Sequence, residues 1–202
     1  MALKPVNFLN KMKKNVFAIL LLVFSVNFSF AQLSAESLID NAISMVQKGD
    51  NQDMSRAIDL VSMGLKSEVN SGSGIFKDKL VSQLGGLGSI ATALKGGVAD
   101  KTALQKTLGI LKTLFAAQGL SNMLKGGNIV GNAAKVTSAI AVVKGGLSLL
   151  GSGKKVDDIA GAFDKITGKT AKLDKKGIFA KFAQNALKKK LGSTLGLVNG
   201  LI

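Results

Sequence analysis

Apolar residues along this chain recur every three to four positions, which is the period of an amphipathic α-helix. The clearest example starts after Asp100, which can cap a helix, and its apolar residues fall at i, i+4, i+7 and i+11: Leu104, Leu108, Leu111 and Phe115. Polar residues fall on the opposite side of this segment. The spacing therefore predicts an amphipathic helix that buries one side.

The same period predicts six further helices. Their expected ranges are 34–48, 50–69, 76–95, 129–144, 156–166 and 178–202. Range 129–144 alternates Ala with Val and Ile, so we expect it to be buried nearly all round. Residues 70–74 read NSGSG, a Ser/Gly linker that sets off 34–69 as an N-terminal helical hairpin.

A lysine followed by glycine recurs where these helices are expected to end. The five sites are Lys48-Gly49, Lys95-Gly96, Lys125-Gly126, Lys144-Gly145 and Lys176-Gly177. Glycine adopts the left-handed conformation that closes a helix, and lysine complements the negative end of the helix dipole. Short connections favour antiparallel neighbours. The sequence thus predicts an all-α fold, a single bundle of about six or seven short helices separated by glycines.

The first thirty-one residues have the pattern of a secretory signal peptide. Met1–Asn15 contains four lysines and no acid, Val16–Phe28 is largely apolar, and Ser29 and Ala31 are small residues just before Gln32. An uncleaved membrane anchor is less favoured, because the apolar run covers only Val16–Phe28, whereas a spanning helix needs roughly twenty apolar residues. We therefore expect cleavage after Ala31, export to the periplasm or the medium, and one helical domain over residues 32–202.

The chain is cationic, lysine-rich and glycine-rich. It has 27 basic and 12 acidic residues; the signal holds four of the lysines and no acid, so residues 32–202 carry a net charge of +11. Arg56 is the only arginine. Lysine acts as a solvated point charge, whereas arginine grips phosphate and carboxylate groups in a fixed geometry. The composition therefore favours diffuse attraction to anionic partners.

Several classes of function lack the residues they need. The chain contains no His, Cys, Trp or Tyr. Zinc and copper sites usually need imidazole or thiolate, catalysis at neutral pH usually recruits His or Cys, and single-strand nucleic-acid binders stack bases on aromatic rings. We expect no catalytic residue, no metal, no cofactor and no specific nucleic acid. An unusual hydrolase with a Ser/Lys or a carboxylate pair is a weaker alternative.

Three local motifs favour structural interpretations. Gly168-Lys169-Thr170 resembles the end of a phosphate-binding loop, but Phe163 stands where that motif needs glycine, so a helix end is favoured. Gly86 to Ala91 matches a dinucleotide-binding fingerprint loosely, inside a helical pattern. Asp50 to Asp53 and Asp157-Asp158 lack the spacing of a calcium loop, and we interpret them as acids at helix starts.

The candidate binding residues lie in the last expected helix. Lys181, Lys188, Lys189 and Lys190 precede the uncharged stretch Leu191–Ile202. Lysines of this kind attract anionic lipid head groups, and an apolar helix face can insert shallowly into a membrane. The alternative, which the sequence favours, is a terminal core helix with a solvated basic face.

Taken together, these patterns predict an exported, cationic, non-enzymatic protein that binds or structures the cell envelope. Its expected partner is an anionic envelope component or a membrane surface. A membrane-active protein, toxin-like or pore-forming, that inserts glycine-rich apolar helices is the alternative.

Export of the whole chain in a bacterial host should yield a protein that starts at Gln32, because the small residues Ser29 and Ala31 fit a signal-peptidase site. Intact-mass measurement of the purified protein checks this. Ala31→Phe should leave the first thirty-one residues attached, and a wild-type protein that retains them would contradict the prediction.

Overall fold

The computed structural model describes residues 34–71, 74–98, 100–127, 129, 131–170 and 178–202. The chain divides into two units, Met1–Ser34 and Ala35–Ile202, and every described helix lies in the second unit. The expected signal peptide, Lys176-Gly177 and the middle of the linker lie outside the described residues.

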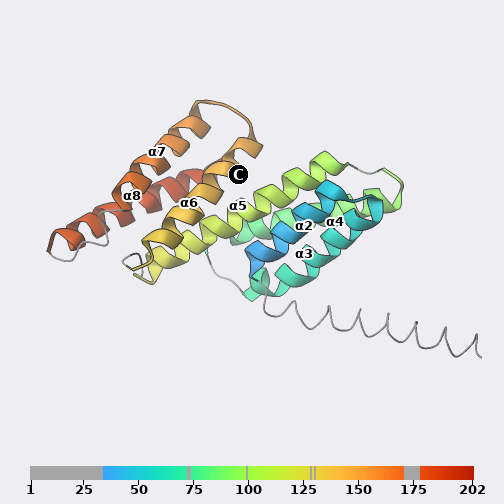
Figure 1. The fold of residues 1–202 in the computed structure, drawn as a ribbon, viewed down its shortest axis with the longest axis horizontal. Coiled ribbons are helices and arrows are strands. Elements are labelled where there is room, and N and C mark those ends of the chain that lie inside the picture. The colour runs from blue at the N-terminus through green and yellow to red at the C-terminus, as the bar shows by residue number, and fades with distance from the viewer. Residues whose placement is uncertain (1–33, 72–73, 99, 128, 130, 171–177) are drawn as a thin grey trace, which may run out of the picture. The chain divides into compact units, whose positions relative to one another are not determined.

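The described part of Ala35–Ile202 is built from helices connected by short turns (Figure 1). In chain order the elements are α2 (Ala35–Lys48), α3 (Asn51–Ser71), α4 (Lys77–Lys95), α5 (Lys101–Lys125), α6 (Ala133–Leu147), the 3₁₀ turn η2 (Ser148–Leu150), α7 (Lys154–Thr170) and α8 (Ile178–Leu201). The all-α prediction is confirmed. The predicted helices agree with the observed ones to within a few residues at most ends.

Local capping interactions start and stop several helices where the sequence predicted. Asp50 caps α3, because its Oδ1 accepts hydrogen bonds from the backbone N–H of Gln52 at 2.8 Å and of Asp53 at 3.1 Å. Asp100 caps α5 and accepts from the N–H of Ala103 at 2.8 Å. After α4 and α5 the chain turns through glycines with positive φ, 81° at Gly97 and 73° at Gly127.

The predicted helix stop at Lys144-Gly145 is wrong. Helix α6 continues to Leu147 and passes into η2, and the turn comes at Gly151, where φ is 106°. Gly146 serves close packing instead, because a Cβ at this position would overlap the side chain of Thr113 on α5. Thr113 is itself buried, with 1% of its surface exposed. The glycine lets α5 and α6 approach each other.

Helix α5 is the centre of the bundle, and the prediction that it buries only one side is wrong over its middle turns. It packs against α2, α4, α6 and α8. The buried residues of its middle turns point in every direction around the helix: Ile110, Leu111, Thr113, Leu114, Phe115, Ala116 and Ala117. Neighbours on several sides therefore cover even the small and polar positions of this helix.

The prediction that helix α6 is buried nearly all round is wrong, because α6 is less buried than its composition indicates. Its core side is a stripe that faces its neighbours α5 and α7: Val136, Ile140, Val143, Gly146 and Leu147. Its outer side is exposed, with Lys135 at its edge and a stripe of small side chains along its middle: Ala134, Ser138, Ala141 and Gly145. The Ala-rich composition suggested burial, but no described element covers this outer side.

Gly146→Ala should destabilise the fold by about 1–3 kcal/mol, because the added methyl group collides with the buried Thr113. Gly161→Ala on α7 is the matched control: its Cβ would meet nothing within 4 Å, so the better helix propensity of alanine should stabilise by up to about 1 kcal/mol. Thermal unfolding of both variants checks the signs. Equal effects of the two substitutions would contradict the close approach of α5 and α6.

Candidate anionic-surface interface

The predicted binding lysines lie along the first part of α8. Lys189 and Lys190 are exposed and Lys188 is partly exposed, while the side chain of Lys181 lies outside the described residues. Within the described chain, no carboxylate forms an ion pair with Lys188, Lys189 or Lys190. Three consecutive positive charges are therefore available to a partner at this place.

The opposite face of α8 is part of the core. Its apolar stripe is at most 1% exposed and packs against α7 and α5: Leu187, Leu191, Leu195 and Val198. The start of the helix is also tied to the turn after α5, since Nε2 of Gln184 donates a hydrogen bond to the carbonyl of Gly127 at 3.3 Å. Helix α8 is thus a core helix with a solvated basic face, and its uncharged stretch is docked on the bundle.

Charge is divided unequally along the chain. Residues 32–100 hold six basic and eight acidic residues, a net charge of −2, whereas residues 101–202 hold seventeen lysines and four aspartates, a net charge of +13. Helices α5, α6 and α8 contain no acidic residue at all. The net charge of the whole chain does not show this division, whereas the net charges of the two halves do.

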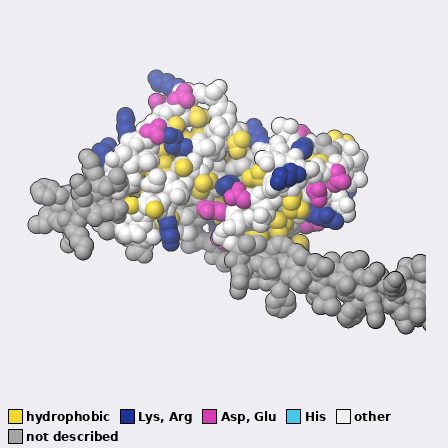
Figure 2. Space-filling model, in the orientation of Figure 1, with side chains coloured by type: hydrophobic (Ala, Val, Ile, Leu, Met, Phe, Trp, Pro, Cys, Tyr) yellow, Lys and Arg dark blue, Asp and Glu magenta, His cyan; other side chains and the backbone are white. Residues whose placement is uncertain are grey.

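Two lysines of the positive half have acidic partners. Lys112 on α5 pairs with Asp40 on α2 at 2.6 Å, and Lys144 on α6 pairs with Asp164 on α7. Both pairs are partly exposed, and such pairs contribute about 0–1 kcal/mol to stability. Figure 2 shows basic side chains spread over the visible face, with apolar surface and some acidic side chains between them. The electrostatic field around residues 101–202 therefore remains strongly positive.

The motifs that resemble nucleotide-binding sites are parts of helices, as the sequence favoured. Gly168-Lys169-Thr170 forms the last turn of α7, and Thr170 is only 2% exposed. The Thr170 hydroxyl donates to the carbonyl of Thr167 at 2.7 Å and lies 3.2 Å from the hydroxyl of Thr137, so it stabilises the packing of α7 on α6. Gly86 to Ala91 lies within α4.

Acidic residues do not gather into a metal site within the part of the chain that the structure describes. Asp50 caps α3 and Asp157 lies in the first turn of α7, as predicted for acids that start helices.

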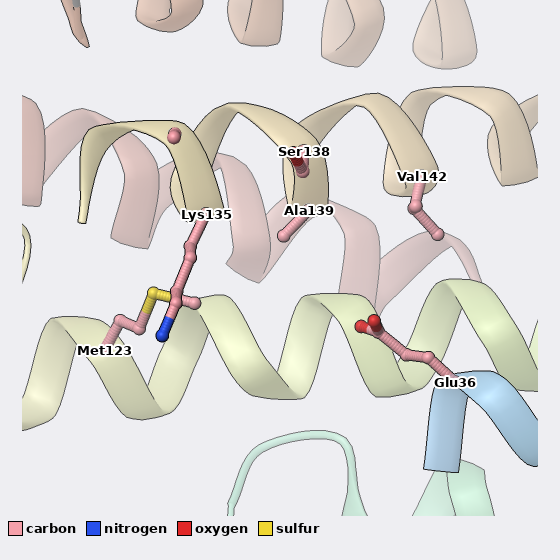
Figure 3. A pocket seen from close by; sticks show the side chains of 7 residues that line it. Glu36, Met123, Lys135, Ser138, Ala139 and Val142 are labelled. Carbon is pink, nitrogen blue, oxygen red and sulfur yellow. The ribbon is translucent and has the colours of Figure 1, made fainter. Parts of the chain in front are cut away.

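A hollow of about 340 Å³ lies between α2, α5 and α6 (Figure 3). It is lined by Glu36, Met123, Ala134, Lys135, Ser138, Ala139 and Val142. Glu36 and Lys135 stand at opposite ends, and small side chains line the groove between them. We refer to this hollow as the α6 groove.

The α6 groove does not assemble a nucleophile with a base. Ser138 and Lys135 lie one turn apart on α6, but their side chains point apart (Figure 3), and no hydrogen bond joins them within the described structure. Both are exposed, whereas a lysine that acts as a base is usually buried. The described groove thus offers a shape and two charged ends to a partner.

One stretch in the described part of the chain has the length and composition of a membrane-spanning helix. Ala133–Leu150 covers 18 residues with a mean hydropathy of 1.4, and 33% of it is buried. The core helix of a water-soluble protein can have the same properties, so this feature carries little weight by itself.

Leu191→Ala should lower the free energy of unfolding by about 2–5 kcal/mol, because it leaves a cavity where α8 docks on the bundle. Lys189→Ala on the exposed face should change it by no more than about 0.5 kcal/mol. Chemical denaturation measures both. A Leu191→Ala variant as stable as the wild type would show that α8 does not dock.

Comparison with family models, with curated proteins and with solved structures found no match to this chain. No relative therefore supplies a ligand or a partner for these lysines, and a function has to be sought in the charge and surface of the chain itself.

Proposed function

We propose that this chain is an exported, non-enzymatic protein that binds an anionic component of the cell envelope through the lysines of residues 101–202. The observation that carries the proposal is the unequal division of charge, −2 over residues 32–100 against +13 over residues 101–202. A protein with this division is attracted to an anionic surface with its positive half foremost. The N-terminal hairpin of α2 and α3 then stays away from that surface.

The distribution of lysines within the positive half supports the same function. Helices α5, α6 and α8 carry lysines without acids, so no internal partner on the same helix neutralises them. Lys188, Lys189 and Lys190 form the densest positive cluster and stand on a face of α8 that the core leaves free. These three residues are the proposed centre of the contact.

The predominance of lysine favours a partner with many dispersed negative charges. Lysine head groups are mobile and hydrated, so they fit a lipid surface or an acidic polymer better than a single small anion with fixed geometry. Contacts between exposed charges are screened over about 8 Å at physiological ionic strength. Binding by this mechanism therefore depends steeply on salt.

A membrane-active protein is the second candidate function. The observation in its favour is Ala133–Leu150, which is long and apolar enough to span a bilayer and is only 33% buried. Insertion of this stretch would require α6 to leave its contacts with α5 and α7. Leakage of dye from vesicles tests it, and vesicles that stay intact at high protein concentration argue against insertion.

The processed protein should float with vesicles of anionic phospholipid at low salt and be released at high salt. Exchange of Lys188, Lys189 and Lys190 for Glu should weaken binding at least about a hundredfold, because each lysine near such a surface contributes about 1 kcal/mol. The matched control exchanges exposed lysines of the near-neutral half for Glu: Lys48, Lys66 and Lys95. It makes the same change in net charge and should weaken binding far less.

Each other result of the flotation experiment has a defined meaning. Flotation at both salt concentrations would contradict the electrostatic mechanism and favour insertion. Equal losses in the two triple variants would show that net charge alone matters and that α8 is not the centre of the contact. Failure to bind anionic vesicles, anionic envelope polysaccharide or any other polyanion at low salt would overturn the proposed function.

A further inference from the structure

The outer side of α6 has the pattern of a helix interface without a partner in the described structure. Its residues are spaced four, three and four positions apart: Ala134, Ser138, Ala141 and Gly145. At 100° per residue they form one stripe that faces away from the core. A Cβ at Gly145 would meet nothing within 4 Å. At the neighbouring Gly146, by contrast, a Cβ would overlap the side chain of Thr113.

The α6 groove beside this stripe is charged at its two ends. Lys135 lies at the end near Met123, and Glu36 lies at the end near Val142 (Figure 3). Both side chains are exposed, and neither forms an ion pair with any residue that the structure describes. The groove therefore combines a smooth floor of small residues with one positive and one negative end.

We propose that the α6 groove is occupied by α6 of a second copy of this chain, antiparallel to the first and related to it by a two-fold axis near Ser138 and Ala141. In a two-fold interface, residue i of one subunit contacts residue j of the other, and j contacts i. An axis at this place sets position 135 opposite positions 142–144, where Lys144 is already neutralised by its ion pair with Asp164. Lys135 of each subunit then reaches the end of the groove that holds the partner's Glu36.

The small residues of the outer stripe fit this arrangement. Helix axes approach to about 8 Å only where the side chains between them are small, as Ala134, Ser138, Ala141 and Gly145 are. A glycine inside a helix costs about 1 kcal/mol relative to alanine, and close approach of a second helix at Gly145 offsets that cost. The dimer also covers part of Ala133–Leu150, which has a mean hydropathy of 1.4 and is only 33% buried.

The charges favour a second copy over other occupants. A two-fold partner supplies its own lysine for Glu36 and its own glutamate for Lys135, so one surface satisfies both ends of the groove. An anionic lipid surface would meet the carboxylate of Glu36 with repulsion. The residues that line the α6 groove do not include Lys188, Lys189 or Lys190 of α8, so this inference does not depend on the proposed function.

A charge-exchange experiment tests the dimer. The whole chain is expressed and exported, and the processed protein is studied by sedimentation velocity over a range of concentrations. The wild type should be a dimer. Glu36→Lys and Lys135→Glu should each raise the dimer dissociation constant at least tenfold. Each substitution brings residue 36 of one subunit and residue 135 of the other together with the same charge, at both ends of the α6 groove. The double variant E36K/K135E should restore association to within a few-fold of the wild type.

Matched controls separate the interface from net charge. Asp59→Lys on α3 and Lys155→Glu on α7 make the same charge changes at exposed positions outside the groove, and they should leave the dimer unchanged. A wild type that stays monomeric at every concentration would overturn the proposal, whatever else fills the groove. A dimer that ignores both groove variants would place the interface elsewhere and would overturn it as well.

A cross-link provides a second readout that does not depend on charge. The chain has no cysteine, so Ser138→Cys introduces the only thiol. In the proposed dimer the two thiols lie close to the two-fold axis, and mild oxidation should give a covalent dimer in high yield. Ser89→Cys on the exposed face of α4 is the control and should remain largely uncross-linked. Equal yields from both positions would indicate random collision and would contradict the proposal.

Discussion

The packing of α5 against its neighbours is the constraint on which the rest of the structure depends. Middle turns of α5 are covered on most sides, and α6 can lie against them only because Gly146 leaves room for the side chain of Thr113. This contact fixes which side of α6 faces the core. It thereby determines that Ala134, Ser138, Ala141 and Gly145 face outward, and that the α6 groove opens beside them.

The same arrangement explains how a strongly basic chain keeps a stable core. A central helix without acidic residues carries its lysines near its ends and at Lys112, which pairs with Asp40 on α2. The chain contains no cysteine, so no disulfide contributes to its stability and apolar burial has to provide it. Helix α8 separates its apolar and charged residues in this way: Leu187 and Leu191 pack into the core, while Lys189 and Lys190 between them face water.

The two proposals concern different surfaces of one molecule and are compatible. Attraction to an anionic partner uses the cluster on α8, and self-association uses the α6 groove. A dimer would present two copies of the α8 cluster, and linked contacts raise the overall affinity without any new interaction at either site. Weak individual lysine contacts would then suffice for firm attachment.

The sequence by itself determined the positions of the helices, their caps and the exposed lysines of α8, because these depend on residues within one or two turns. Asp50 and Asp100 cap helices through backbone groups two or three residues away, and the period of Leu104, Leu108 and Leu111 is a local property. Only the tertiary structure decided which helix is central, why Gly146 is glycine, and that Glu36 shares a groove with Lys135. Thr113 is 33 residues from Gly146 and Glu36 is 99 residues from Lys135, so no local pattern reports on these contacts. Burial depends on how many neighbours surround a helix, so the apolar spacing of α5 and the Ala-rich composition of α6 each predicted the wrong degree of burial.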